Sequence, residues 1–409
     1  MTQVYEGTGN VPALKAIWSN LKDFPRSLSL SAAVAGILIV LIGTFGTGPI
    51  VVQAAQVGHL SEAQTASWFF TILMGSGLYG IYLSLRMRMP LVGAWSTPSA
   101  ALLVTGLATH TINEAVAAYF VAAVLLTIIG WAGLLEKILA LVPRPVTMAM
   151  LGGILFNFGV GIFPSLIKEP AIVLTMIIFF FIGRRFQWRA PVVASFASGL
   201  IFSAILGKAH QPHLKVEWAH PIWVSPHFTV SSVATLGIPL LLLTLTSQFA
   251  PGMSVVNGFG YKAPVNRSIV TGGLLSLVSA GFLSSGVNSA AITAAIGAGE
   301  QAEPDKSRRY TAGVVSGLGY SFLGIFGSTF LGFFGSIPTP MLMAIAGLAL
   351  MPAIANSTHE ALVDPQYREA ALVTLLITVS NISAFKLGAA FWGLVGGVVV
   401  HQIVVFKRK

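Results

Sequence analysis

Residues 95–101 read Trp95-Ser96-Thr97-Pro98-Ser99-Ala100-Ala101, a polar, proline-containing interruption in a long apolar chain. A second interruption, Gly286-Val287-Asn288-Ser289-Ala290-Ala291, aligns with the first after a shift of 190 positions. Proline suits the first turn of a helix, and serine, threonine and asparagine suit the cap before it. The sequence therefore predicts two half-helices that begin inside a membrane. Interrupted helices at matching places in two halves of a chain point to the binding site of a transporter.

The composition indicates an all-α polytopic membrane protein. Of the 409 residues, 55% are hydrophobic and only 9% are charged. The 43 glycines and 21 prolines suit closely packed and interrupted membrane helices. The chain has no cysteine, which excludes disulfides, cysteine-held metal sites and thiol nucleophiles.

Fourteen apolar stretches, several of them short, can be placed along the chain. They lie near residues 30–52, 64–84, 92–106, 114–134, 147–163, 170–183, 191–206, 230–255, 267–281, 284–299, 310–331, 338–354, 369–385 and 389–406. With the N-terminus inside, nineteen of the 23 Lys and Arg residues fall on the inner side, a strong positive-inside asymmetry. The net charge of +10 therefore reports topology, not a nucleic-acid partner. We expect a multi-pass protein of the bacterial inner membrane, embedded in the lipid bilayer with both termini cytoplasmic.

Two polar segments flank the first set of apolar stretches. Residues 1–29 read as an amphipathic cytoplasmic lead-in, with Trp18 and Phe24 suited to the membrane interface, and a disordered tail is the alternative. Residues 207–229 divide the chain into halves of nearly equal length. They contain four histidines, a residue type that commonly binds metal ions. No carboxylate or thiolate stands at ligand spacing, so we expect an extracytoplasmic, solvated linker and no metal.

Further candidates for the walls of the site lie near the interruptions. The first apolar stretch contains a small-residue run with Phe45, Gly46 and Thr47. In the second half, Ser247, Gln248 and Phe249 precede a proline and a glycine in the same manner. Gln248 is an amide deep in an apolar segment and needs a partner, which is either the site or a neighbouring helix. The ring of Trp95 is expected to form a wall over the substrate, and a place in the interfacial aromatic belt is the alternative.

Five stretches that span most of the chain resemble the benzoate/proton symporter family, within the wider fold of the uracil/xanthine permeases and sulfate permeases. They are residues 95–103, 247–252, 287–296, 304–310 and 390–395. The resemblance implies fourteen segments as two inverted seven-segment repeats, over residues 30–206 and 230–406, with segments 3 and 10 each a short extended stretch followed by a half-helix. Segments 1–4 and 8–11 would form a core domain that carries substrate past a gate domain of segments 5–7 and 12–14. A homodimer is also implied.

The substrate expected from this pattern is an anion. Uracil-type permeases use acidic residues in segments 8 and 10, whereas the matching positions here are Ser247, Gln248, Asn288 and Ser289. Two facing helix N-termini each present unpaired N–H groups and about half a positive charge. Benzoic acid, with a pKa of about 4, is an anion at neutral pH. We therefore expect its carboxylate between the backbones of residues 96–99 and 287–289, with Gln248 and Asn288 as side-chain donors.

The expected substrate-binding residues form one set. They are Phe45, Gly46, Thr47, Trp95, Ser96, Thr97, Pro98, Ser99, Ser247, Gln248, Phe249, Gly286, Val287, Asn288 and Ser289. Proton coupling is implied by the resemblance alone, with Glu114, Glu300 and His401 as candidate carriers. We expect no cofactor and no enzymatic activity, because acid/base pairs and nucleophile motifs are missing. A transporter of another anion or a nucleobase on the same fold and an anion channel are the alternatives.

Overall fold

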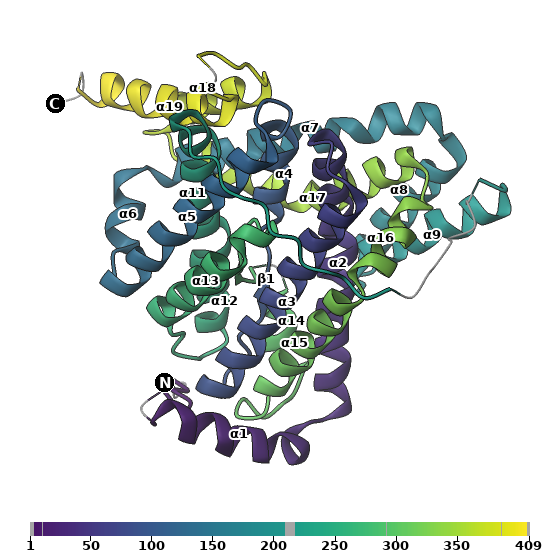
Figure 1. Cartoon of the computed structure of the whole chain (residues 1–409), viewed down its shortest axis with the longest axis vertical. Coiled ribbons are helices and arrows are strands. Elements are labelled where there is room, and N and C mark those ends of the chain that lie inside the picture. Colours follow the sequence, from purple (N-terminus) through teal and green to yellow (C-terminus); the bar gives the residue numbers. More distant parts are fainter. Residues whose placement is uncertain (1–3, 10, 209–216, 292, 386, 407–409) are drawn as a thin grey trace.

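The computed structural model describes residues 4–9, 11–208, 217–291, 293–385 and 387–406, and the chain is mostly helical (Figure 1). Within these ranges, six helices are long and apolar enough to cross a membrane. They are α2 (Leu30–Val57), α3 (Glu62–Met87), α5 (Ile112–Ala132), α7 (Arg144–Lys168), the continuous helix Val230–Gly258 and α17 (Thr339–Leu362). Helices α15 (Tyr310–Ile325) and α16 (Gly327–Gly335) meet at 74° and make a seventh span if they count as one.

The other predicted stretches form shorter elements. They are α4 (Thr97–Gly106), α8 (Pro170–Arg185), α9 (Pro191–Ile205), α13 (Val265–Ser279) with the 3-10 turn η3 (Ala280–Phe282), α14 (Ala294–Ala298), α18 (Arg368–Val379) and α19 (Ala389–Phe406). Helices α1 (Ala13–Ser27) and α6 (Leu135–Leu141) and the strands β1 (Gly93–Ala94) and β2 (Asn288–Ser289) complete the fold. The described residues thus contain six or seven helices of full length, and the arrangement of fourteen segments stays a prediction.

The continuous helix Val230–Gly258 is not regular along its length. It consists of α10 (Val230–Ser232), the π-helical turn η1 (Val233–Gly237), α11 (Ile238–Thr244), the π-helical turn η2 (Leu245–Phe249) and α12 (Ala250–Gly258). A π turn holds one residue more than an α turn and changes the direction in which the following side chains point. Such turns are frequent at functional sites.

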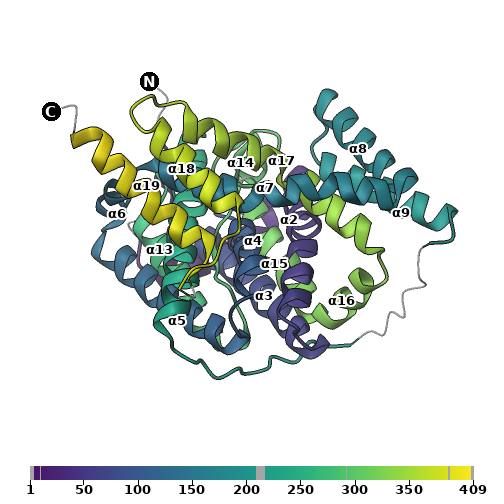
Figure 2. The same cartoon turned by 90° about the horizontal axis from the view of Figure 1, so that it is seen from above.

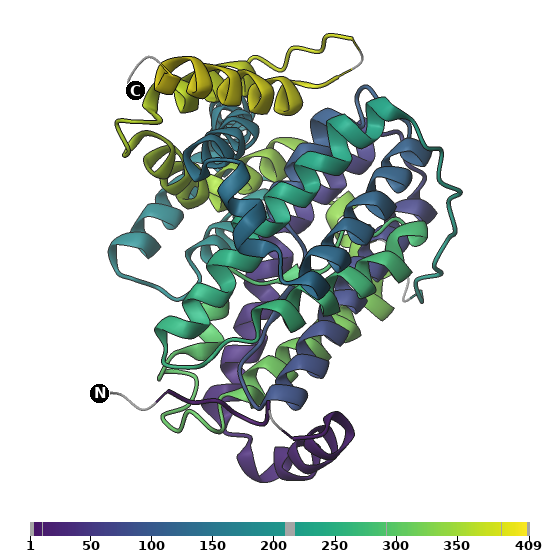
Figure 3. The same ribbon diagram turned by 90° about the vertical axis from the view of Figure 1, so that its left-hand side faces the viewer.

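The helices group into two bundles. Helices α7, α8, α9, α17, α18 and α19 pack on one another, and Figure 3 shows α18 and α19 in yellow at the end of the molecule opposite α1. The second bundle holds α2, α3, α5, α13 and α15, with α3 against α15 and α5 against α13. The bundles meet where α2 and α4 contact α7, α9 and α17.

Residues 217–229 contain no helix or strand, and they run along one edge of the molecule in Figure 2. This segment is bonded to several helices: the Ile222 N–H donates to Ser67 Oγ (2.9 Å) and the Val224 N–H to the Gly281 carbonyl (2.8 Å). Most residues of this segment are nevertheless exposed, and its role as a solvated extracytoplasmic linker stays a prediction. His210 and His213, two of its histidines, lie outside the described residues.

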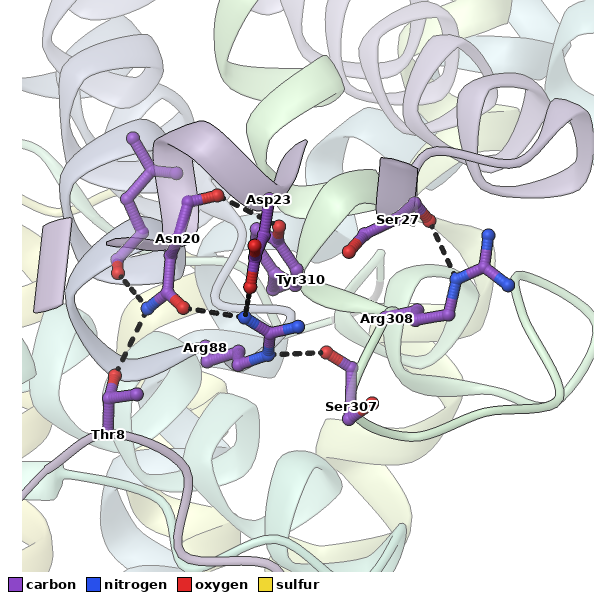
Figure 4. A network of polar contacts seen from close by, with 9 residues as sticks. Thr8, Asn20, Asp23, Ser27, Arg88, Ser307, Arg308 and Tyr310 are labelled. Atoms are coloured by element: carbon purple, nitrogen blue, oxygen red, sulfur yellow. Dashed lines mark hydrogen bonds and ion pairs between the residues drawn. The ribbon is translucent and has the colours of Figure 1, made fainter. Parts of the chain in front are cut away.

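The predicted lead-in contains helix α1, which packs against the end of α3 and the start of α15 (Figure 4). Asn20 is 1% exposed, and its amide donates to the Leu85 carbonyl (2.7 Å) and accepts from Arg88 (2.8 Å). Trp18 is exposed, as the interface expectation requires, whereas Phe24 packs on the protein beside Leu85. Phe24 is only partly buried, and its place at the membrane interface stays a prediction.

Candidate substrate site

The two interrupted segments meet as a two-stranded antiparallel sheet. Gly93 lies opposite Ser289 and Ala94 opposite Asn288, and the Ala290 N–H donates to the Val92 carbonyl at 3.0 Å. Figure 1 places β1 in the interior of the molecule, surrounded by helices. Stretches that are almost two hundred residues apart in sequence therefore converge, as their matched spacing predicted.

Helix α4 follows β1 and is the first of the two predicted half-helices. Ser96 caps it, because its Oγ accepts from the Ser99 N–H at 3.1 Å. Pro98 has no N–H, and the Ala100 N–H already donates to the Ser96 carbonyl (3.0 Å). Neither Pro98 nor Ser99 therefore offers a free N–H at this helix end.

The second half-helix begins later than predicted. Helix α14 starts at Ala294 and has five residues, so Asn288 and Ser289 lie in a strand and not in the first turn of a helix. Their main-chain groups pair with β1, and Gly252 of α12 approaches so closely that a Cβ there would lie 2.5 Å from the Ala290 carbonyl oxygen. Two facing helix N-termini are therefore not present at Asn288.

Several buried polar side chains on or near these segments have no hydrogen-bond partner among the described residues. Both amide atoms of Asn288 are unpaired although the residue is 0% exposed. The same holds for Ser99 Oγ, Trp95 Nε1 and Thr44 Oγ1. Buried polar groups are almost always paired, because an unpaired one costs about 1–3 kcal/mol. These orphaned groups mark the candidate site.

Helix α2 supplies one wall. Thr47 Oγ1 and Thr97 Oγ1 are 2.7 Å apart and join α2 to α4. A Cβ on Gly46 would lie 3.8 Å from Ala349 of α17, and the Phe45 ring centroid is 5.0 Å from that of Phe196 on α9. The run 45–47 therefore lies where the two bundles meet. Thr44 was missed, although its place one turn before Thr47 puts both hydroxyls on one helix face.

The turn η2 lies against β2, so the predicted run 247–249 reaches the site only in part. The Gln248 side chain is 8% exposed and makes no hydrogen bond within the described ranges. The Ser247 hydroxyl donates to the Leu243 carbonyl of its own helix. Phe249 is fully buried against Gly272. Of the two polar side chains in this run, only that of Gln248 has no hydrogen-bond partner within the described ranges.

Gly286 and Val287 position the second segment and do not line the site. Gly286 has φ +122°, a conformation that favours glycine. The Val287 N–H donates to Ser276 Oγ (2.8 Å), and the Val287 side chain fills the space beside Gly75 of α3. Trp95 packs edge-on against Tyr320 of α15, with ring centroids 5.3 Å apart.

The three candidate proton carriers lie on different elements. Glu114 accepts from the Thr111 N–H (2.9 Å) in the cap of α5, and Glu300 is exposed just beyond α14. His401 stacks on Tyr367, with ring centroids 4.4 Å apart. The structure does not assemble them into one relay.

Gly93→Ala is expected to disrupt transport, because a Cβ at this position would overlap the Ser76 carbonyl oxygen. The strand β1 would have to shift against rigid backbone, and the register with Asn288 would be lost. Uptake measured in proteoliposomes should fall by at least about tenfold, the cost of roughly 1.4 kcal/mol. Gly258→Ala is the matched control, since no atom lies within 4 Å of its Cβ position. Full activity in Gly93→Ala would contradict this role of β1.

Comparison with known proteins gives the family. Residues 26–403 match the family model described as BenE: Benzoate membrane transport protein. The chain is 38% identical over 385 residues to the "Benzoate membrane transport protein" of Acinetobacter baylyi, which covers 94% of this chain and 98% of that one. It is 36% identical over 371 residues to the "Inner membrane protein YdcO" of Escherichia coli, covering 91% and 95% of the two chains.

Solved structures give the fold. "The overall structure of SLC26A9" superposes with a TM-score of 0.62 at 12% identity and covers 97% of this chain and 69% of that one. The transmembrane domain of the cyanobacterium bicarbonate transporter BicA gives 0.58 at 14% identity, covering 91% and 96%. The predicted transporter fold is therefore confirmed. The chain is a membrane transporter and not an enzyme, and it belongs to the BenE family of benzoate membrane transport proteins.

Proposed function

We propose that this protein imports benzoate or a similar aromatic carboxylate across the bacterial inner membrane by proton symport. The names of its two relatives, a benzoate membrane transport protein and an inner membrane protein, support this assignment. The observation that carries it is the amide of Asn288, which is fully buried and unpaired where the two interrupted segments meet.

The site suits a carboxyl group attached to an aromatic ring. Asn288 Nδ2, Ser99 Oγ and Trp95 Nε1 are donors in need of an acceptor. The ring would lie toward Phe45, whose aromatic neighbours are Phe196 of α9 and Phe333 of α16. Sites for such ligands combine an apolar lining with a few placed polar groups.

The division into two bundles supports a proposal for the transport movement. We assign the bundle around β1 and β2 to the core domain and the bundle of α7, α8, α9 and α17 to α19 to the gate, within two inverted repeats of seven segments. The contacts of α2 and α4 with α7, α9 and α17 then form the sliding surface. The distribution of Lys and Arg supports a cytoplasmic position of both termini, and a homodimer is part of the proposal.

Uptake of labelled benzoate into proteoliposomes with an inward proton gradient tests this function. We expect saturable uptake that is reduced by excess unlabelled benzoate and by collapse of the gradient. Uptake of sulfate or uracil but not benzoate would overturn the substrate assignment. A conductive flux that neither saturates nor exchanges would identify a channel instead.

A further inference from the structure

We infer that the substrate binds and crosses the membrane as the neutral carboxylic acid, so that the transported proton travels on the substrate and not on a side chain. This inference rests on the proposed function and concerns the same site. Its chemistry is the pairing of a carboxyl group with the Asn288 amide.

The hydrogen-bonding capacity of Asn288 carries the argument. Its Nδ2 is a donor and its Oδ1 an acceptor, and both are unpaired in a residue that is 0% exposed. A carboxylate offers acceptors only, so it would pair with Nδ2 and leave Oδ1 buried and unsatisfied. A carboxylic acid offers one O–H donor and one acceptor side by side. It therefore satisfies both atoms of the amide at once, through two parallel hydrogen bonds.

The surroundings also favour an uncharged ligand. None of the residues predicted for the site is charged, so a buried carboxylate would have no cationic partner. Main-chain N–H groups at the two helix ends were expected to take the place of a cation, but few of them are available. At α4, Pro98 has no N–H and the Ser99 N–H is bonded to Ser96 Oγ. The other helix, α14, begins five residues after Ser289. A neutral acid needs no compensation of this kind.

The same binding mode explains proton coupling in a site without a titratable group. Glu114 belongs to the cap of α5, Glu300 is exposed and His401 lies against Tyr367. In our scheme, benzoate takes one proton from water on the outer side, and the resulting acid binds to Asn288. After the core has moved, the acid dissociates and gives one benzoate and one proton to the inner side. The cycle is electroneutral, and the protein is never protonated.

Competition against labelled benzoate in proteoliposomes tests the inference with the unmodified protein. Benzamide is neutral and carries the same adjacent donor and acceptor as benzoic acid. Benzenesulfonate is a permanent anion of similar size that has acceptors only. We expect benzamide to inhibit uptake at pH 7 and benzenesulfonate to be without effect. Inhibition by benzenesulfonate without inhibition by benzamide would overturn the inference and establish an anion site.

The pH dependence gives a second readout. Above the benzoic acid pKa of about 4, the protonated fraction falls tenfold for each pH unit. The KM for total benzoate should therefore rise about tenfold per unit, whereas the inhibition constant of benzamide should stay constant. A KM that does not change with pH would contradict the neutral-acid mode. Failure of the proposed function is distinguishable, because proteoliposomes would then take up no more benzoate than protein-free liposomes at any pH.

Discussion

Asn288→Leu is expected to raise the KM for benzoate uptake strongly without lowering the stability of the protein. Leucine has the branched shape of asparagine but offers no hydrogen bond to a carboxyl group. A hydrogen bond to a charged group contributes about 1.5–3 kcal/mol and one between neutral groups about 1 kcal/mol, so the loss of the pair should raise the KM by roughly tenfold to a hundredfold. Because the buried amide has no hydrogen-bond partner among the described residues, removal of its polar atoms relieves a desolvation cost. The melting temperature should stay equal or rise.

Asn20→Leu is the matched comparison. Asn20 is another buried asparagine, at 1% exposed, but its amide is bonded to Thr8, Leu85 and Arg88 (Figure 4). The same substitution should lower the melting temperature here and leave the KM of the folded protein unchanged. Uptake kinetics and thermal unfolding of the two variants, measured together, separate a binding role from a structural one. Normal uptake by Asn288→Leu would remove Asn288 from the site.

Arg309→Met is expected to prevent the protein from accumulating in folded form. The guanidinium of Arg309 is 1% exposed and donates to the carbonyls of Glu303, Pro304 and Ala298. Methionine fills much of the same volume but leaves three carbonyls without their donor, at about 1–3 kcal/mol each. The sum is comparable to the whole stability of a typical domain, about 5–15 kcal/mol. The measurement is the monodisperse fraction and the melting temperature in detergent.

Arg308→Met provides the control at the adjacent position. Arg308 is partly exposed and donates to the Ser27 and Arg26 carbonyls, where water can replace it. Its loss should cost less than about 1.5 kcal/mol, the usual net value of one hydrogen bond. Equal behaviour of the two variants would show that the Arg309 contacts do not hold the end of α14.

The sequence predicted the convergence of the interrupted segments but not their local geometry. Pro98 and the serines around it determine α4 through short-range rules of helix capping, so this half-helix could be predicted. The late start of α14 depends on pairing of Asn288 and Ser289 with Gly93 and Ala94, which no local rule reveals.

The orientation of side chains in the eighth predicted segment was also beyond the sequence. A regular helix assigns Phe249 to the face next to that of Gln248, but the π turn η2 inserts an extra residue and rotates the side chains beyond it. The burial of Arg309 was missed for another reason. Its basic neighbours at 306 and 308 indicate a cytoplasmic loop, and the sequence does not distinguish the buried Arg309 from the partly exposed Arg308.

The pairing of β1 with β2 restricts how this transporter can change shape. One strand comes from each half of the chain, so main-chain hydrogen bonds connect the N-terminal and C-terminal halves at the centre of the molecule. A rocker-switch motion, in which the two halves tilt apart about a central hinge, would break the hydrogen bonds between β1 and β2 on every cycle. The strand pairing is compatible with an elevator motion, in which both strands move together as one rigid body with the bound substrate.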